Sequence, residues 1–309
     1  MADNPASSPP RSMPPAPGSS GPVPVAFVGT GSMASPMATN IAKRGFPVAI
    51  WNRSQDRSNA HAALGVKPRG NPRECVQGAR IVVTFVTDEA ALMDVLERPD
   101  GVLVGIEKDA TIVDFSTVGR AAALRAVELA KGAGARFVDS PMSGTLAMAE
   151  RGELIALVGG RLNDVTRAQP VIQAVSKKII HAGDVGQGQA LKVLLEGVGA
   201  HQLTAFVSML VLGERAGLAR RVVVDALMSS AYASPAYLAR REKSIAKDYS
   251  AETPLTQSLK DALLNVTLQQ EVGLPLPVQR EITRALEKAV EEGLGDEDVF
   301  ALEKYYKSL

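Results

Sequence analysis

The sequence has few of the residues from which disulfides and metal sites are built. Cys75 is the only cysteine among 309 residues, so no intrachain disulfide can form and nothing indicates an oxidising compartment. The three histidines, His61, His181 and His201, lie far apart, and no two of them have the i, i+4 spacing of a helical metal site. We therefore expect neither a metal site nor a disulfide framework.

A strong excess of one charge is also missing. The chain carries 34 basic and 33 acidic side chains, and a net charge of +1 gives no sign of the basic patch with which proteins bind nucleic acid. No continuous apolar run reaches the roughly 18 residues of a membrane span, and the N-terminus lacks the apolar stretch of a signal peptide. These absences predict a soluble, cytoplasmic protein without a nucleic-acid or membrane partner.

The beginning of the chain differs in composition from the rest. Residues 1–24 hold eight of the 19 prolines, separated by serine, glycine and alanine, and contain almost no bulky apolar side chains. Such a segment buries too little surface to offset the entropy that it would lose on ordering. We expect residues 1–22 to form a disordered tail.

Short apolar runs alternate with helical patterns between residues 23 and 186. Continuous runs rich in β-branched residues are typical of strands that are covered on both faces of a parallel sheet. Strands that alternate with helices indicate βαβ units. The sequence therefore predicts an α/β fold with an N-terminal Rossmann-type, doubly wound sheet, whose first strands are Val23–Val28, Val48–Trp51, Ile81–Val86 and Thr111–Phe115.

The strand pattern stops after Gly186, and residues 187–309 are predicted to form an all-helical domain for substrate binding and oligomerisation. Its first helix, Ala190–Ala216, is about 27 residues long and apolar on several faces. A helix of this kind has to be covered by other helices or by a second subunit. We expect a homodimer, or a homotetramer built from dimers.

A glycine motif follows the first predicted strand. Gly29, Gly31 and Ala34 fit the pattern G-x-G-x-x-A, in which the first glycine allows a tight turn and the second lets a pyrophosphate approach the backbone. Ser32 and Met33 lie inside the motif, at the start of a predicted helix whose amides point at the phosphates. The motif predicts a dinucleotide cofactor.

The end of the second predicted strand indicates which cofactor it is. Sites that prefer NAD usually have a carboxylate there, which binds the ribose 2′-hydroxyl. This chain has Asn52, Arg53 and Ser54 instead. Arg53 can pair with a 2′-phosphate, and its neighbours can donate hydrogen bonds to it, so the sequence predicts NADP(H). The alternative is an ordinary surface arginine.

Four motifs, in this order, are similar to those of the β-hydroxyacid dehydrogenase superfamily, and the resemblance covers about residues 23–307. They are Gly29–Asn40, Asp139–Gly144, Gly186–Lys192 and Leu259–Asp261.

The resemblance implies hydride transfer between nicotinamide C4 and a substrate carbon, with Lys192 as the catalytic general acid. It also implies that Ser143, Gly144 and Thr145 lie at the substrate. The cofactor contacts that it implies are Val86, Thr87, Thr117 and Lys260.

The chain departs from the family pattern at two of these positions. Glu196 stands four residues after the lysine, where an asparagine is usual, and Thr145 stands where a second glycine is usual. An ionised Glu196 cannot donate a hydrogen bond and would repel a carboxylate substrate. The alternative is that Glu196 only pairs with Lys192 one helical turn away.

Taken together, these features predict an NADPH-dependent oxidoreductase that reduces an aldehyde or semialdehyde to an alcohol. An imine reductase or reductive aminase is the close alternative, although those enzymes usually replace the lysine. A non-enzymatic, dehydrogenase-like binding module is disfavoured by Lys192 and by the balanced charge. Tyr232 is a candidate substrate contact; it and Tyr237 are the other possible proton donors, although packing is the commoner role of such tyrosines.

Overall fold

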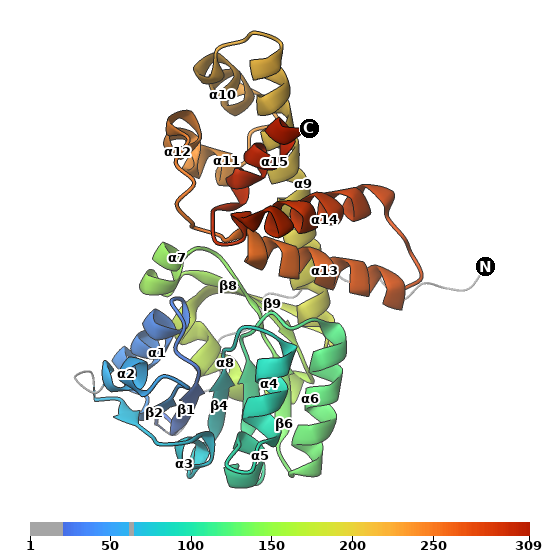
Figure 1. Ribbon diagram of the computed structural model, residues 1–309. Helices are drawn as coiled ribbons and strands as arrows, with labels where there is room; N and C mark the ends of the chain where they lie inside the picture. Colours follow the sequence, from blue (N-terminus) through green and yellow to red (C-terminus); the bar gives the residue numbers. More distant parts are fainter. Residues whose placement is uncertain (1–20, 62–64) are drawn as a thin grey trace. The chain divides into compact units, whose positions relative to one another are not determined.

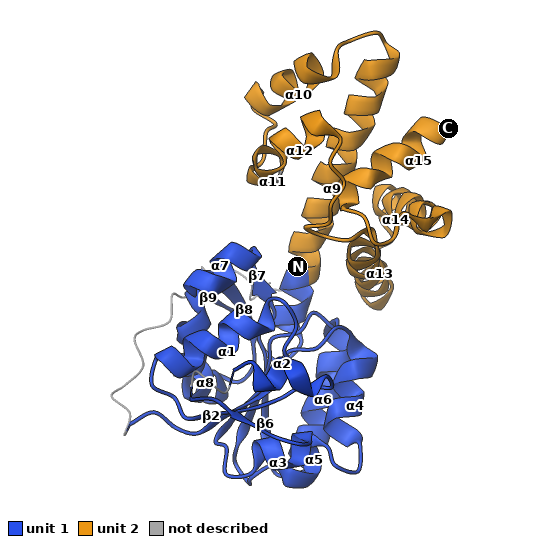
Figure 2. Ribbon diagram, turned by 60° about the vertical axis from the view of Figure 1, so that its left-hand side comes forward, with its two compact units in different colours: residues 1–192 blue, residues 193–309 orange. Residues whose placement is uncertain are grey.

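The computed structural model describes residues 21–61 and 65–309, so most of the predicted tail, residues 1–22, lies outside the described residues. The chain forms two compact units, residues 1–192 and residues 193–309 (Figure 2). They divide inside the long helix α9 (Gln187–Arg215), a few residues after the predicted domain boundary at residue 186.

The first unit is built around a twisted sheet of nine strands in the order β3-β2-β1-β4-β5-β6-β8-β7, with β9 paired to β8 (Figure 1). The strands from β3 to β6 are parallel, whereas β8 is antiparallel to both β6 and β7. The strand bounds are β1 (Val25–Val28), β2 (Val48–Trp51), β3 (Lys67–Pro68), β4 (Ile81–Thr84), β5 (Thr111–Asp114), β6 (Arg136–Asp139), β7 (Met142–Ser143), β8 (Leu154–Gly159) and β9 (Ser176–Gly183).

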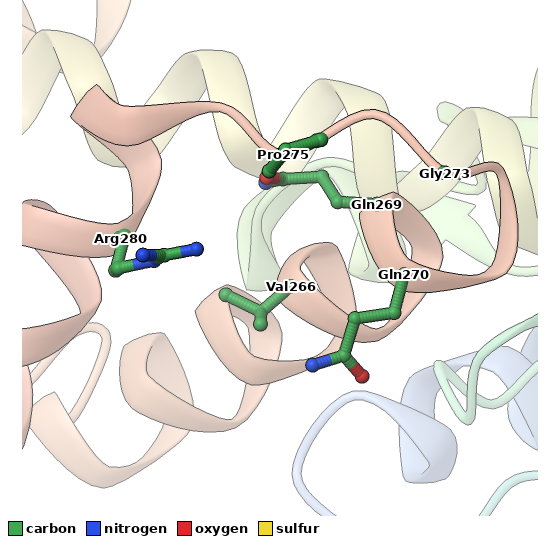
Figure 3. A pocket seen from close by; sticks show the side chains of 6 residues that line it. All are labelled: Val266, Gln269, Gln270, Gly273, Pro275 and Arg280. Carbon is green, nitrogen blue, oxygen red and sulfur yellow. The ribbon is translucent and has the colours of Figure 1, made fainter.

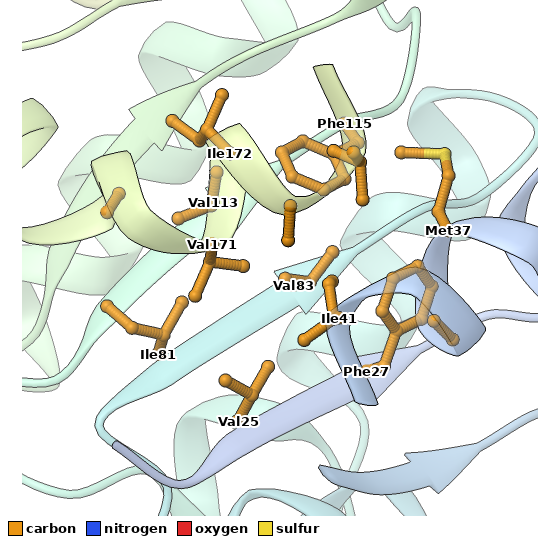
Figure 4. Close-up of a cluster of buried hydrophobic side chains, with 14 of the residues drawn as sticks. Val25, Phe27, Met37, Ile41, Ile81, Val83, Val113, Phe115, Val171 and Ile172 are labelled. Atoms are coloured by element: carbon orange, nitrogen blue, oxygen red, sulfur yellow. The ribbon is translucent and has the colours of Figure 1, made fainter. Parts of the chain in front are cut away.

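Both faces of this sheet are covered, which explains why its strands are continuously apolar. Val25 and Phe27 of β1 pack into one cluster with α1 and α8 (Figure 4), whereas Ala26 and Val28 pack into a second cluster with α3, α4 and α6. The predicted doubly wound sheet is confirmed. The helices of this unit are α1 (Ala34–Lys43), α2 (Gln55–Asn59), α3 (Pro72–Val76), α4 (Glu89–Glu97), α5 (Val102–Gly105), α6 (Arg120–Gly132), α7 (Leu146–Arg151) and α8 (Leu162–Val175).

The second unit is helical, as predicted. Phe206 of α9 lies at the centre of its core, against the rings of Tyr237 and Phe300. Arg240 separates α11 from α12 within the segment 234–246, so this segment is not one continuous helix. Besides α9, the unit contains α10 (Arg220–Ser229), α11 (Pro235–Ala239), α12 (Arg241–Ala246), α13 (Leu255–Glu271), α14 (Pro277–Ala289), η2 (Val290–Leu294), η3 (Val299–Ala301) and α15 (Leu302–Ser308).

A buried ion-pair network ties the far end of α9 to α10 and α15. Glu303, which is 1% exposed, accepts hydrogen bonds from both terminal nitrogens of Arg220, at 2.8 and 2.6 Å. Lys307 bridges Glu303 and Glu214. Burial alone would raise the pKa of Glu303, but the hydrogen bonds and charges of Arg220 and Lys307 outweigh it and lower that pKa. The network therefore stabilises the helical unit while Glu303 is ionised.

The length and composition of α9 would also allow it to cross a membrane, although no continuous apolar run of that length is visible in the sequence. Core helices of soluble proteins pass the same test. Helix α9 nevertheless carries exposed apolar side chains, because Leu194, Val198 and Leu212 are 55%, 56% and 58% exposed.

Candidate dinucleotide site and catalytic helix

The glycine loop lies where the strand order reverses, between the carboxyl ends of β1 and β4. Gly29 has φ +109°, and a Cβ atom placed on it would lie 2.1 Å from the carbonyl oxygen of Phe85, which follows β4. Only glycine fits both the backbone conformation and the approach of the two loops. The tight turn that the motif predicts is present.

The next two residues form a cradle that fits a pyrophosphate. A Cβ atom on Gly31 would meet open space, so the backbone there is accessible to a ligand. The Thr30 hydroxyl is buried and has no hydrogen-bond partner among the described residues. Ser32 is exposed beside the cradle, and Met33 precedes the first turn of α1, whose amides point outwards from the helix end.

The residues after β2 close the other side of this loop. Asn52 accepts a hydrogen bond from the Thr30 backbone N–H (3.0 Å) through its Oδ1 and donates to the Ser54 carbonyl (3.0 Å) through its Nδ2. Its amide therefore fixes the shape of the cradle. Arg53 and Ser54 are both exposed, and the Ser54 side chain makes no cap hydrogen bond to α2 within the described chain. Direct contacts of these residues with a nucleotide remain predictions.

The role of His61 was not predictable from the sequence. Its ring is buried, with Nε2 2.8 Å from the Ser35 hydroxyl in the first turn of α1 and Nδ1 2.9 Å from the Arg57 carbonyl oxygen. His61 thus joins the segment after α2 to the start of the helix that follows the glycine loop. The two hydrogen bonds span 26 and four residues of sequence, and no local pattern reveals the longer one.

A buried carboxylate organises the loops after β4 and β5. Asp114 Oδ1 accepts hydrogen bonds from the hydroxyls of Thr84 (2.8 Å) and Ser116 (2.6 Å). The Ser116 hydroxyl in turn accepts from the Val86 N–H (2.9 Å). Burial raises the pKa of Asp114 to about 6, although the hydrogen bonds from Ser116 and Thr84 act in the opposite direction.

Val86, Thr87 and Thr117 are the cofactor contacts that the family resemblance assigns to these two loops. The Thr87 hydroxyl donates to Asp88 (3.0 Å), the residue that caps α4. Val86 follows β4 and Thr117 follows β5, so the two residues lie in neighbouring loops at the carboxyl edge of the sheet. The hydrogen bond from the Val86 N–H to the Ser116 hydroxyl joins these loops.

A second buried carboxylate, Asp139, lies at the end of β6, opposite Asp114 in the strand register. Its two oxygens accept hydrogen bonds from the backbone N–H groups of Gly186 (2.7 Å) and Gln189 (2.8 Å), at the first turn of α9. Burial raises the pKa of Asp139 to about 7; the two backbone hydrogen bonds lower it, and the charge of Asp114 raises it. A carboxylate from a different element thus caps the start of α9.

Gln189 joins this helix turn to the loop that carries Thr117. Its side chain is fully buried. Its Oε1 accepts from the N–H groups of Val118 (3.1 Å) and Gly119 (3.2 Å), and its Nε2 donates to the Ser116 carbonyl (2.8 Å). Three hydrogen bonds therefore hold the loop after β5 against the first turn of α9.

The predicted substrate residues follow β6. Ser143 ends β7, and Thr145 caps α7 by accepting a hydrogen bond from the Met148 N–H (3.3 Å). A Cβ atom on Gly144, between them, would lie 2.7 Å from a methyl group of Leu154. The threonine that replaces the usual glycine therefore has a local structural role at the start of α7.

Lys192 and Glu196 are partly buried and lie one turn apart on α9. In the helical unit, Lys260 of α13 pairs with Asp261 (3.4 Å), and Tyr232 is 87% exposed in the loop after α10. The Tyr237 hydroxyl donates to the Gln202 carbonyl, and burial raises the pKa of Tyr237. Of these two tyrosines, Tyr237 is therefore the poorer candidate for a proton donor.

The helical unit also contains a hollow. It has a volume of about 320 Å³ at the turn between α13 and α14 (Figure 3). Gln269 on its wall accepts a hydrogen bond from the Leu276 N–H (2.7 Å) and donates to Asn265 (2.7 Å), so its amide holds the turn. The hollow is lined by Val266, Gln269, Gln270, Gly273, Pro275 and Arg280, none of which is a predicted site residue.

The sequence matches two family models that together cover nearly all of the described chain. Residues 24–183 match the NAD binding domain of 6-phosphogluconate dehydrogenase, and residues 186–306 match the NAD-binding domain of NADP-dependent 3-hydroxyisobutyrate dehydrogenase. The chain belongs to the β-hydroxyacid dehydrogenase family. It is therefore an NAD(P)-dependent oxidoreductase, and the expectation of an enzyme is confirmed.

Relatives within this family include two reductases of Arabidopsis thaliana. Glyoxylate/succinic semialdehyde reductase 1 is 30% identical over 278 residues, which cover 90% of this chain and 96% of the relative. The chloroplastic reductase 2 is 29% identical over 282 residues, 91% of this chain and 79% of the relative. A 3-hydroxyisobutyrate dehydrogenase from Salmonella typhimurium has the same fold, with a TM-score of 0.83, 24% identity, and coverage of 92% of this chain and 99% of that one.

Two glycine substitutions separate folding from cofactor binding. Gly29→Ala should lower the free energy of unfolding by about 1–3 kcal/mol, because the new methyl group meets the Phe85 carbonyl and the backbone is strained. Gly31→Ala should leave stability within about 0.5 kcal/mol, since its methyl group enters open space. It should nevertheless weaken dinucleotide binding by roughly tenfold or more, about 1.4 kcal/mol. Thermal unfolding without nucleotide and a fluorescence titration measure the two effects, and wild-type affinity in Gly31→Ala would contradict the cradle.

Proposed function

We propose that the protein uses NADPH to reduce an aldehyde or semialdehyde to the corresponding alcohol, with Lys192 as the general acid. The observation that carries the proposal is the position of Lys192 on α9, one turn after Gln189, whose side chain is bonded to the loop that carries Thr117. The lysine is thereby attached to the edge of the sheet at which the dinucleotide cradle lies.

The cofactor, when bound, supplies the hydride to the carbonyl carbon. Gly31 and the amides at the start of α1 would hold its pyrophosphate, and Val86, Thr87, Thr117 and Lys260 would line the rest of its site. The Lys192 ammonium would stabilise the negative charge that develops on the carbonyl oxygen and then donate a proton from Nζ to it. Ser143, Gly144 and Thr145 would orient the substrate.

The choice of NADPH rests on the end of β2. Arg53 is exposed there, and the sequence has Asn52, Arg53 and Ser54 at the positions where a carboxylate would favour NAD. A guanidinium and two neighbouring donors suit a 2′-phosphate. The reducing direction follows by association, because NADPH generally supplies reductions.

The substrate class rests on the relatives that reduce glyoxylate and succinic semialdehyde, and on Glu196. We infer that Glu196 faces the substrate and disfavours an anionic one, so that a neutral aldehyde is preferred over a semialdehyde acid.

Imine reduction is the second candidate, because a carboxylate suits an iminium cation, whereas Lys192 favours a carbonyl. NADPH oxidation with succinic semialdehyde, a neutral aldehyde and a cyclic imine distinguishes them. We also propose that the protein is cytoplasmic.

We propose a homodimer as the simplest assembly, with a tetramer as the alternative. The apolar side chains of Leu194, Val198 and Leu212 on α9 are each more than half exposed. Exposed apolar patches beyond a few hundred Å² usually mark an interface. A second copy of the helical unit would cover such a surface through a two-fold contact.

Cofactor preference should depend on Arg53. We expect NADPH to bind at least about tenfold more tightly than NADH, roughly 1.4 kcal/mol. Arg53→Asp should reverse this order, because a carboxylate repels the 2′-phosphate and accepts from a 2′-hydroxyl. Arg44→Asp, which makes the same charge change at the exposed far end of α1, is the control. Equal affinities of the wild-type protein for both cofactors would contradict the assignment.

Catalysis should depend on the Lys192 proton. Lys192→Ala should slow hydride transfer in a single turnover by about a hundredfold or more, with NADPH affinity nearly unchanged. Lys192→Arg keeps the positive charge but not an acid that can donate at neutral pH, so it should stay slow. Lys178→Ala, at an exposed position of β9, is the control. A normal rate in Lys192→Ala would transfer the role to another donor, with Tyr232 the next candidate.

Substrate choice should depend on the charge of Glu196. Glu196→Asn restores a hydrogen-bond donor and removes a negative charge, so activity on succinic semialdehyde and glyoxylate should rise, mainly through a lower KM. Two like charges about 4 Å apart at an effective dielectric of 20 repel each other by about 4 kcal/mol. Even a small fraction of this repulsion between Glu196 and a substrate carboxylate would change KM measurably. Glu292→Asn, at an exposed position of η2, is the control. An unchanged profile would mean that Glu196 only pairs along the helix.

The assembly should be visible by light scattering. At micromolar concentration the 32.5-kDa chain should have the mass of a dimer or a tetramer, and Val198→Glu should shift it towards the monomer by burying a charge in the contact. Lys304→Glu, at an exposed position of α15, should leave the mass unchanged. A monomeric wild-type protein would contradict the expected dimer.

A further inference from the structure

The start of α9 is packed unusually closely against Asp139. A Cβ atom on Gly188, in the first turn of the helix, would lie 2.7 Å from Asp139 Oδ2 and 2.4 Å from the Leu157 carbonyl oxygen. A Cβ atom on Gly159, at the end of β8, would lie 2.4 Å from Asp139 Oδ1. The two glycines make room for a carboxylate between the helix and two strands.

The hydrogen bonds of Asp139 and Gln189 meet at one residue. The Gln189 N–H donates to Asp139, while the Gln189 side chain accepts from Val118 and Gly119 and donates to Ser116. Both side chains are fully buried, so water does not compete for these bonds. Hydrogen bonds of Asp139 and Gln189 therefore connect the end of β6, the first turn of α9 and the loop after β5.

We propose that Asp139 and Gln189 form a latch of two positioning residues that sets where Lys192 lies relative to the cofactor loop 116–119. Lys192 follows Gln189 by three residues, slightly less than one helical turn, so a shift or rotation of the first turn of α9 also moves the Lys192 side chain. This inference rests on the proposed role of Lys192. Neither residue of the latch needs to touch substrate or nicotinamide.

The latch has two consequences that a merely stabilising contact lacks. Misplacement of a catalytic group by about 1 Å can slow a reaction by about 10²-fold while the ligands still bind. Loss of either residue should therefore lower kcat much more than it raises KM. The two losses should also be non-additive, because both break the same connection.

The test compares Asp139→Asn, Gln189→Met and the double variant with wild-type protein. Asp139→Asn keeps the shape but loses one acceptor, and Gln189→Met keeps the length but loses all three side-chain hydrogen bonds. Each single variant should slow single-turnover NADPH oxidation by succinic semialdehyde by ten- to a hundredfold. The Kd for NADPH should change less than threefold, and the double variant should be little slower than the slower single variant.

Hydrogen–deuterium exchange without cofactor gives a readout that does not depend on activity. The Gln189→Met variant should exchange faster at the amides of residues 117–120 and of the first turn of α9, by tenfold or more, although the substitution changes only one of these segments. Exchange in β1 and α1 should stay unchanged.

Asp164→Asn is the matched control. Asp164 is a buried carboxylate of the same unit, paired with Arg136 (3.0 Å) at the opposite end of β6. Its loss should lower thermal stability without changing hydride transfer or the exchange of residues 117–120.

The outcomes separate this inference from the proposed function. Wild-type exchange of residues 117–120 in Gln189→Met, or wild-type hydride transfer in a folded Asp139→Asn, would overturn the latch. Wild-type protein that oxidises no NADPH with any carbonyl would overturn the proposed function, and the exchange of Gln189→Met would still decide the latch. If Asp139→Asn does not fold, the rate of hydride transfer and the hydrogen–deuterium exchange of Gln189→Met together test the latch.

Discussion

The buried carboxylate of Asp139 is the constraint on which the edge of the sheet depends. A charged or protonated carboxyl group without water needs hydrogen-bond partners from the protein, and the donors that it finds are the Gly186 and Gln189 amides. Those amides have no partners within their own helix turn. The carboxylate at the end of β6 and the N–H groups at the start of α9 thus serve as hydrogen-bond partners for each other. This contact is possible only because Gly159 and Gly188 have no side chains that would occupy the space of the carboxylate.

The same edge of the sheet gathers the residues on which the proposed reaction depends. Asp114, opposite Asp139, holds the loops after β4 and β5 together, and Gln189 attaches the second of these loops to α9. A dinucleotide cradle, the loops beside it and a helix that carries a lysine are therefore one connected structure within the first unit. This arrangement accounts for Gly188 and Gln189 in the short Gly186–Lys192 motif, which also carries the lysine.

The fold was predictable from the sequence because its signals are local. Continuous apolar runs identified the strands β1, β2, β4 and β5, and the spacing of Gly29 and Gly31 placed the cradle. The hydrogen bond from Thr84 to Asp114 and those of Asp139 and Gln189 were not predictable, because they join residues that are 30 to 73 positions apart. The hydrogen bond between His61 and Ser35 was not predictable for the same reason. The motif residues were visible, but their partners were not.

The most direct test of the central claim is the fate of the hydride. A neutral aldehyde and, in parallel, succinic semialdehyde are reduced with NADPH that carries deuterium at one or the other of the two C4 positions, and the alcohols are analysed by mass spectrometry. We predict that one of the two labels appears on the new carbinol carbon and that this label also slows turnover. An alcohol without deuterium from either label, or no alcohol at all from succinic semialdehyde, neutral aldehydes and glyoxylate, would contradict the claim.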